Sequence, residues 1–306
     1  MVSDGRTPRL LGVLVTFRRP AELEEILRTL AAQDRSFDRL VVVDNDPTDD
    51  ARDLVATWCP TAEYVPTAEN LGPAGGIAVG MSRLLEGASD DDWLATLDDD
   101  DPPAPSTLGA LLDFGVATRT VDPSTGAVGV AGVRLDRRRG RYLRVPDVEL
   151  HGAVRVDSIG GNKWPVYSVA AIRSAGVFRP DLFFGHEELE FGLRLGEAGY
   201  SLYASGPLWA DLRRTEVEEG RDIQPSLTVT AVGWRRYYSL RNLVRVLRDH
   251  GATSGAVYVS VVVGVAKPVA NLVVNPRVAW QNLRWNARAL RDAWTGRLGR
   301  TVEPGS

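Results

Sequence analysis

The sequence holds a single cysteine, Cys59, among 306 residues, so no disulfide can form within the chain. This scarcity is typical of a protein from a reducing compartment. Only three histidines are present, none at the Cys/His spacing of a zinc site, and no Walker A lysine motif or Ser-His-Asp arrangement stands out. Zinc modules and P-loop enzymes are therefore excluded, and carboxylates, glycines and arginines remain to do any chemistry.

Long apolar runs are also missing. The first ten residues are polar, and the apolar stretch that follows ends at Val15, so we expect no signal peptide. Residues 256–266 are almost wholly apolar, but they fall short of the roughly 20 residues that span a bilayer, and Lys267-Pro268 interrupts them. We expect a buried or interfacial helix there and a cytoplasmic protein.

Charge is unevenly distributed along the chain. The formal net charge is −4, yet residues 234–300 contain twelve Lys or Arg and two acids. We expect a catalytic domain over residues 1–225 and a basic helical extension over residues 226–306. The extension either docks on an anionic membrane, at the inner face of the plasma membrane, or presents a solvated basic face. Self-association stays open, and no nucleic-acid motif appears.

Three apolar runs, residues 10–15, 40–43 and 93–97, alternate with helical patterns in the first third of the chain. Such continuous runs are typical of parallel strands covered on both faces. Each run is followed by a polar residue: Thr16, Asp44 and Asp98. Because ligands bind beyond the carboxyl ends of strands in open α/β sheets, we expect these three ends to meet in one cleft.

Four consecutive aspartates, Asp98 to Asp101, follow the third run. Adjacent carboxylates repel one another unless a cation or solvent offsets their charge. Mg²⁺ or Mn²⁺, which prefer oxygen ligands, would do so and would bridge to phosphate. A solvated turn closed by Pro102 and Pro103 explains the cluster equally well on its own.

Three further segments contain groups suited to ligand binding. The glycine-rich loop of residues 70–76 follows the second strand by more than twenty residues, whereas a dinucleotide fingerprint follows the first strand directly, so a Rossmann dehydrogenase is not expected. Glu187 and Glu188 are candidate general bases, although acids at a helix start also suit the helix dipole. The Gly160-Gly161 turn allows close backbone approach to a ligand.

Taken together, these segments resemble the inverting GT-A glycosyltransferases of family 2, over roughly residues 11–215. The matching elements occur in order: the loop after the first strand at residues 15–20, Asp44 at the second strand end, a 70–76 loop typical of rhamnosyl- and galactofuranosyltransferases, a D-x-D element at residues 98–100, and the acidic segment of residues 183–194. The resemblance implies a GT-A fold, a mostly parallel central sheet flanked by helices, with a C-terminal helical extension.

The resemblance also assigns roles to individual residues. Asp98 and Asp100 would hold Mg²⁺ or Mn²⁺ on the donor diphosphate, and Asp99 would face the sugar. Glu188, favoured over Glu187, would be the base. Many members carry a metal-binding histidine after the base helix; this chain has none, and Asp211 is the nearest oxygen ligand. The remaining assignments are Thr16, Phe17, Arg18, Asp44, Asn70, Gly72 and Gly75 on the nucleotide and donor side, and Trp164 and His186 on the acceptor side.

The implied reaction is a single displacement that moves a sugar from UDP-galactofuranose or dTDP-rhamnose to a glycan, lipid-linked or small-molecule acceptor. Two other classes stay open. A nucleotidyltransferase that makes nucleotide sugars would typically need a glycine-rich phosphate loop after the first strand, which residues 16–20 do not provide. A catalytically silent carbohydrate- or nucleotide-binding relative would not need Asp98, Asp100 and Glu188.

Overall fold

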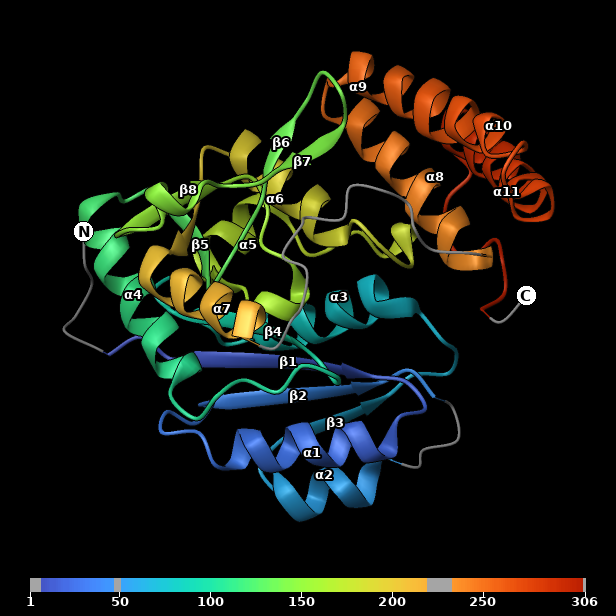
Figure 1. The fold of residues 1–306 in the computed structure, drawn as a ribbon. Coiled ribbons are helices and arrows are strands. Elements are labelled where there is room, and N and C mark those ends of the chain that lie inside the picture. The colour runs from blue at the N-terminus through green and yellow to red at the C-terminus, as the bar shows by residue number, and fades with distance from the viewer. Residues whose placement is uncertain (1–6, 47–50, 219–232, 305–306) are drawn as a thin grey trace.

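The computed structural model describes residues 7–46, 51–218 and 233–304, and an eight-stranded mixed sheet lies at its centre (Figure 1). The strand order is β3-β2-β1-β4-β9-β5-β10-β8. Within it, β9 runs antiparallel to β4 and β5, and β8 runs antiparallel to β10; the other pairs are parallel. The strands are β1 (Leu10–Thr16), β2 (Arg39–Asp44), β3 (Glu63–Pro66), β4 (Trp93–Asp98), β5 (Thr125–Gly129), β8 (Ala153–Val156), β9 (Val166–Ser168) and β10 (Ser201–Ser205).

Helices cover both faces of this sheet, and a separate helical layer stands beside it (Figure 1). The mostly parallel α/β sheet and the C-terminal helical extension are thus confirmed. The helices around the sheet are α1 (Pro20–Ala31), α2 (Arg52–Trp58), α3 (Gly72–Leu85), α4 (Thr107–Val121), α5 (Val169–Ala175), α6 (Glu187–Glu197) and α7 (Gly206–Glu218). The layer beside it contains α8 (Gly233–Asp249), α9 (Thr253–Tyr258), the π-helical segment η4 (Val259–Ala266), α10 (Lys267–Ala270) and α11 (Pro276–Thr295).

The apolar runs form the predicted strands because both faces of the sheet are covered. All seven residues of β1 are buried, with Leu11 and Val13 in one core cluster and Leu10 and Leu14 in the other. In the parallel register Thr16 pairs with Asp44, and Val15 pairs with Asp98. The carboxyl ends of β1, β2 and β4 therefore meet at one edge, as the sequence predicted.

The middle third of the chain is less regular than the first. The strand β5 ends at Gly129 and β8 ends at Val156. Beyond these ends, Val133 exchanges backbone hydrogen bonds with Asp157 and Ser158. The loop expected over residues 70–76 is short, since α3 begins at Gly72. The basic segment 134–144 contains the hairpin β6 (Arg134–Asp136) and β7 (Arg141–Leu143).

Buried polar contacts fix the C-terminal helices to the part of the chain that surrounds the sheet. Arg241 of α8 is fully buried and donates from Nη2 to the carbonyl of Leu182 at 2.9 Å. Asn242 Nδ2 is within 2.9 Å of the carbonyl oxygens of Leu182, Phe184 and Gly185. Buried carbonyls without partners destabilise a fold, so α8 stabilises the loop that leads into α6. The expected boundary between residues 225 and 226 lies outside the described residues.

His250, which follows α8, joins the same two parts of the chain. Its Nδ1 lies 2.7 Å from Glu197 Oε1, and its Nε2 lies 3.8 Å from Glu190 Oε1; both acids belong to α6. Burial disfavours the charged ring, but the two carboxylates outweigh burial and raise the pKa of His250. The protonated ring therefore holds the helical layer against α6.

This pairing predicts a pH dependence of stability. Because the folded-state pKa of His250 exceeds its ordinary value of about 6.5, its contribution is complete below that pH and is lost as pH rises through the folded-state pKa. We expect the urea midpoint to fall between about pH 6 and about pH 8, and to fall less in His250→Gln. The exposed His151 supplies the control: His151→Gln should keep the parent's slope. Equal slopes in all three proteins would contradict the assignment.

Candidate functional site

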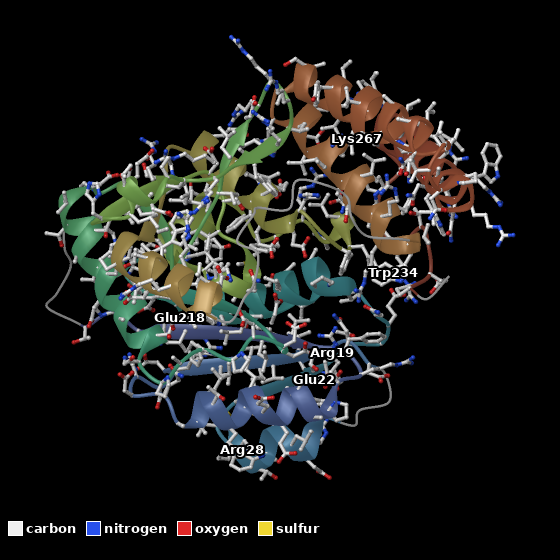
Figure 2. All side chains as sticks on the ribbon, viewed as in Figure 1. Arg19, Glu22, Arg28, Glu218, Trp234 and Lys267 are labelled. Carbon is white, nitrogen blue, oxygen red and sulfur yellow. The ribbon has the colours of Figure 1, made fainter. Side chains whose placement is uncertain are left out.

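A cleft of about 480 Å³ opens at the edge where β1, β2 and β4 end. The loop after β1, the start of α3, the aspartates after β4 and the start of α6 supply its walls, and the first turn of α8 closes one side. Figure 2 labels Arg19 and Trp234, which both line it. Of the three strand-end residues expected to meet in one cleft, Thr16 and Asp98 line it and Asp44 does not; Glu188 lines it as well.

Asp98 and Glu188 approach each other across the backbone of Gly161. The Gly161 N–H donates to Glu188 Oε1 at 3.1 Å. A Cβ atom at Gly161 would lie 2.6 Å from Asp98 Oδ2 and 2.9 Å from Glu188 Oε1, closer than Cβ atoms are normally found. The glycine therefore allows two carboxylates from separate elements to face one small space.

The electrostatics of this pair indicate an excess of negative charge. Burial, followed by the neighbouring Glu188, raises the pKa of Asp98 to about 7. Burial also raises the pKa of Glu188, opposed by the Gly161 N–H. For Glu187 burial and the adjacent Glu188 raise the pKa well above its usual range, and its Oε2 atom has no hydrogen-bond partner among the described residues. A proton or a cation must offset this charge.

Arg19 pairs with the next two aspartates. Its Nη1 lies 2.6 Å from Asp100 Oδ2 and 3.2 Å from Asp99 Oδ1, and the Thr16 hydroxyl donates to Asp99 Oδ2 at 2.8 Å. The Asp100 side chain is 52% exposed and turns toward this arginine. Among the described residues no group of three or more acids, histidines or cysteines is placed to hold a metal ion.

On the nucleotide side the structure corrects the position of Asp44. Its carboxylate is buried, accepts from the Tyr64 hydroxyl at 2.7 Å and from the Asp46 N–H at 2.9 Å, and lies behind the cleft wall. Asn45 lines the cleft instead and donates to the carbonyl of Gly72 at 3.1 Å. Phe17 and Arg18 line the cleft as predicted, with Arg18 Nε 3.1 Å from Asp46 Oδ2.

The glycines of the 70–76 segment divide into two roles. Asn70 and Gly72 line the cleft, and Asn70 Oδ1 accepts from the Gly72 N–H at 2.8 Å. Gly72 has φ +70°, and a Cβ there would lie 2.1 Å from the Phe183 carbonyl oxygen, so only glycine fits. Gly75 does not line the cleft, because it packs on Leu71 within α3.

Three further predicted site residues do not line the cleft. His186 is partly buried with Nδ1 2.8 Å from the Tyr142 hydroxyl, and its removal from solvent lowers its pKa to about 4. The Trp164 indole donates to the carbonyl of Asp101 at 2.9 Å, so it braces the aspartate turn. Asp211 lies on α7, is 61% exposed and pairs with Arg214 outside the cleft.

The C-terminal extension contributes a wall that the sequence analysis missed. Trp234 and Arg235 at the start of α8, and Pro304, line the cleft. The Arg235 guanidinium lies over the rings of Trp234 and Phe184, at 5.2 and 6.0 Å from their centroids. The aromatic-basic sequence at residues 234–236 is the signal that could have identified this wall, but we assigned it to the basic extension alone.

Comparisons with known proteins agree with this geometry. Residues 13–159 match the model of glycosyl transferase family 2. Galactofuranosyltransferase GlfT1 of Mycolicibacterium smegmatis is 31% identical over 208 residues, which are 63% of this chain and 67% of that protein.

Two solved structures are similar in fold. The mannosyltransferase PcManGT from Pyrobaculum calidifontis, in complex with GDP-Man and Mn²⁺, aligns with a TM-score of 0.52 and 16% identity over 96% of this chain and 89% of its own. GalNAc-T7 with UDP, GalNAc and Mn²⁺ aligns with a TM-score of 0.61 and 12% identity over 96% of this chain and 58% of its own. At these identities they bear on the fold alone.

The two adjacent glycines offer a matched test of the carboxylate pair. A methyl group in Gly161→Ala would displace Asp98 and Glu188, whereas at Gly160 a Cβ would meet only Asn162 Oδ1, at 3.3 Å. Since a displacement of about 1 Å can lower turnover by about 10²-fold, we expect that loss in Gly161→Ala and near-parent turnover in Gly160→Ala. Full turnover of a folded Gly161→Ala protein would contradict the geometry.

Proposed function

Since the chain belongs to glycosyl transferase family 2, and is a glycosyltransferase, we propose that it transfers a hexosyl group from a nucleotide-diphosphate sugar to an acceptor hydroxyl with inversion. The observation that supports this proposal best is the meeting of Asp98 and Glu188 in one cleft. One carboxylate lies on the strand end where a diphosphate would bind, and the other begins a helix across the cleft.

The donor side suits a divalent cation. Mg²⁺ and similar ions bind through one or two carboxylates together with substrate phosphates, rather than in an all-protein cage. Asp98, whose charge burial disfavours, is the first ligand we assign; Asp100 joins it once Arg19 releases that carboxylate. The ion, Mg²⁺ or Mn²⁺, would supply a Lewis acid that offsets charge on the leaving diphosphate.

Glu188 is the general base in this proposal, and Glu187 is not. Its raised pKa lies closer to neutral pH than an ordinary carboxyl group's, which favours proton transfer, and the Gly161 N–H fixes its orientation. Burial and the adjacent Glu188 raise the pKa of Glu187 well above its usual range, which favours its protonated form and makes it the poorer proton acceptor. Glu188 thus takes the proton of the acceptor hydroxyl as its oxygen attacks the anomeric carbon.

For the sugar we propose UDP-galactofuranose rather than dTDP-rhamnose, because the relative from Mycolicibacterium smegmatis is a galactofuranosyltransferase. The acceptor, a glycan or a lipid-linked sugar, would lie against the aromatic wall of Phe184 and Trp234. A nucleotidyltransferase is not favoured, since Phe17, Arg18 and Arg19 stand where its glycine-rich phosphate loop would be.

Paired amide substitutions at the two glutamates test the base. Glu188→Gln keeps the oxygen that accepts from Gly161 but cannot take a proton, so turnover with UDP-galactofuranose should fall by about 10²–10⁴-fold while UDP binding persists. Glu187→Gln resembles the protonated acid and should retain most of the turnover. Product analysis by mass spectrometry measures both, and the reverse ranking would assign the role to Glu187.

A second pair tests the metal position. UDP with Mn²⁺, at about 100 times its Kd, should stabilise the parent by about 2.7 kcal/mol in a thermal-shift assay, and dTDP should stabilise it less. Asp98→Asn should lose the Mn²⁺-dependent part of this shift. Asp211→Asn should keep it, because Asp211 pairs with Arg214 outside the cleft. Loss of the shift in Asp211→Asn alone would contradict the assignment.

A further inference from the structure

The outer helix of the C-terminal layer, residues 253–270, carries a row of exposed valines. Val257, Val261, Val265 and Val269 are 47, 57, 47 and 47% exposed, and Val273, just beyond the helix, is 91% exposed. The helix is long and apolar enough to be a candidate membrane span, yet only 33% of it is buried. We call these five residues the valine row.

The opposite face of this helix is held by α11. Ala256, Ser260, Gly264 and Pro268, each one residue before a valine of the row, are buried. The Trp294 indole donates to the Ser260 hydroxyl at 3.1 Å, and a Cβ at Gly264 would lie 2.9 Å from a Leu290 methyl group. The valine row therefore cannot turn inward without breaking these contacts.

The helical geometry keeps the row straight. In an α-helix, residues four apart drift by about 40° around the axis, because one turn takes 3.6 residues. Residues 259–266 are π-helical, and hydrogen bonds to the fifth residue put more residues in each turn, which takes back part of that drift. The valines consequently share one outward face instead of spiralling around the helix.

The sequence around the valine row is rich in cations. Residues 251–291 contain five cations and no Asp or Glu, and the next residue, Asp292, is buried and pairs with Arg291. Tyr258, next to Val257 in the sequence, is 40% exposed, and Trp280 on α11 is 62% exposed. Valines, aromatic residues and cations together are the composition of helices that lie in a membrane interface. The cations are Lys267, Arg277, Arg284, Arg288 and Arg291; Figure 2 labels Lys267 within this layer.

We propose that this face docks on an anionic lipid bilayer, with the valine row in the boundary between headgroups and acyl chains and the cations on the headgroups. The helix lies on the membrane and does not cross it, because α11 covers its other face. A second copy of the chain is a poorer partner, since two such faces would bring Lys267, Arg277, Arg284 and Arg288 of each copy together, and no acid lies between residues 251 and 291 to offset them.

Docking goes beyond the proposed function and does not depend on it. Bilayer binding is measured without any sugar transfer, so the two proposals fail separately. In Figure 1 the layer of α9, α10 and α11 lies outside α8, on the side away from the sheet. The membrane would thus contact the layer whose inner helix lines the cleft, and the protein would be peripheral on the membrane.

Vesicle co-sedimentation of the full-length chain tests the proposal. We expect the parent to pellet with phosphatidylglycerol vesicles, to bind phosphatidylcholine vesicles weakly, and to lose part of its binding in high salt, because only the electrostatic contribution is screened. The double variant Val261→Glu/Val265→Glu should partition at least about tenfold more weakly, since burying even one valine is worth that much.

The matched control makes the same kind of double substitution outside the C-terminal helical layer. Val121 and Val148 are 88 and 85% exposed, so Val121→Glu/Val148→Glu adds equal charge without touching the valine row and should pellet like the parent. Equal loss in both variants, or full binding of the variant at residues 261 and 265, would overturn the proposal. If the parent does not bind vesicles but forms dimers, and Val261→Glu/Val265→Glu abolishes these dimers, the face would be assigned to a second copy of the chain.

Discussion

The site depends on holding two carboxylates, Asp98 and Glu188, at a separation that neither would adopt freely. Their mutual repulsion is tolerated because β4 and α6 are fixed by the core and because Gly161 puts only a backbone N–H beside them. Burial raises the pKa of both groups, and Glu188 adds to the rise at Asp98. In the reaction proposed above, a cation would bind at Asp98 and Glu188 would take up a proton. Arg19 offsets the remaining charge at Asp99 and Asp100.

The fold was predictable where local pattern and tertiary burial agree. The runs that became β1, β2 and β4 are continuously apolar, and their neighbours in the sheet bury them on both faces. Because the carboxyl ends of parallel strands share an edge, the convergence of Thr16 and Asp98 also followed from sequence. The Glu-Glu pair at the start of α6 was predictable from its position at a helix start.

The errors share one cause, which is contacts between distant residues. Asp44 and His186 were expected to face ligands, but Tyr64 and Tyr142 bind them from other elements. Nothing near either residue in the sequence indicates such a partner. The same holds for Trp234, whose place in the cleft wall depends on how α8 packs against the loop before α6. Composition alone therefore identified the extension as basic and did not reveal that it also forms part of the cleft wall.

The contact of Arg241 and Asn242 with the loop before α6 affects how the chain can fold during synthesis. Domains fold largely from the N-terminal end as the ribosome releases them. Here the carbonyls of Leu182, Phe184 and Gly185 leave the ribosome some sixty residues before the side chains that will bind them, as their separations of 60, 58 and 57 positions show. The sheet can form early, but the loop before α6 gains these partners only after α8 has emerged, so the cleft wall that contains Glu188 is completed late in synthesis.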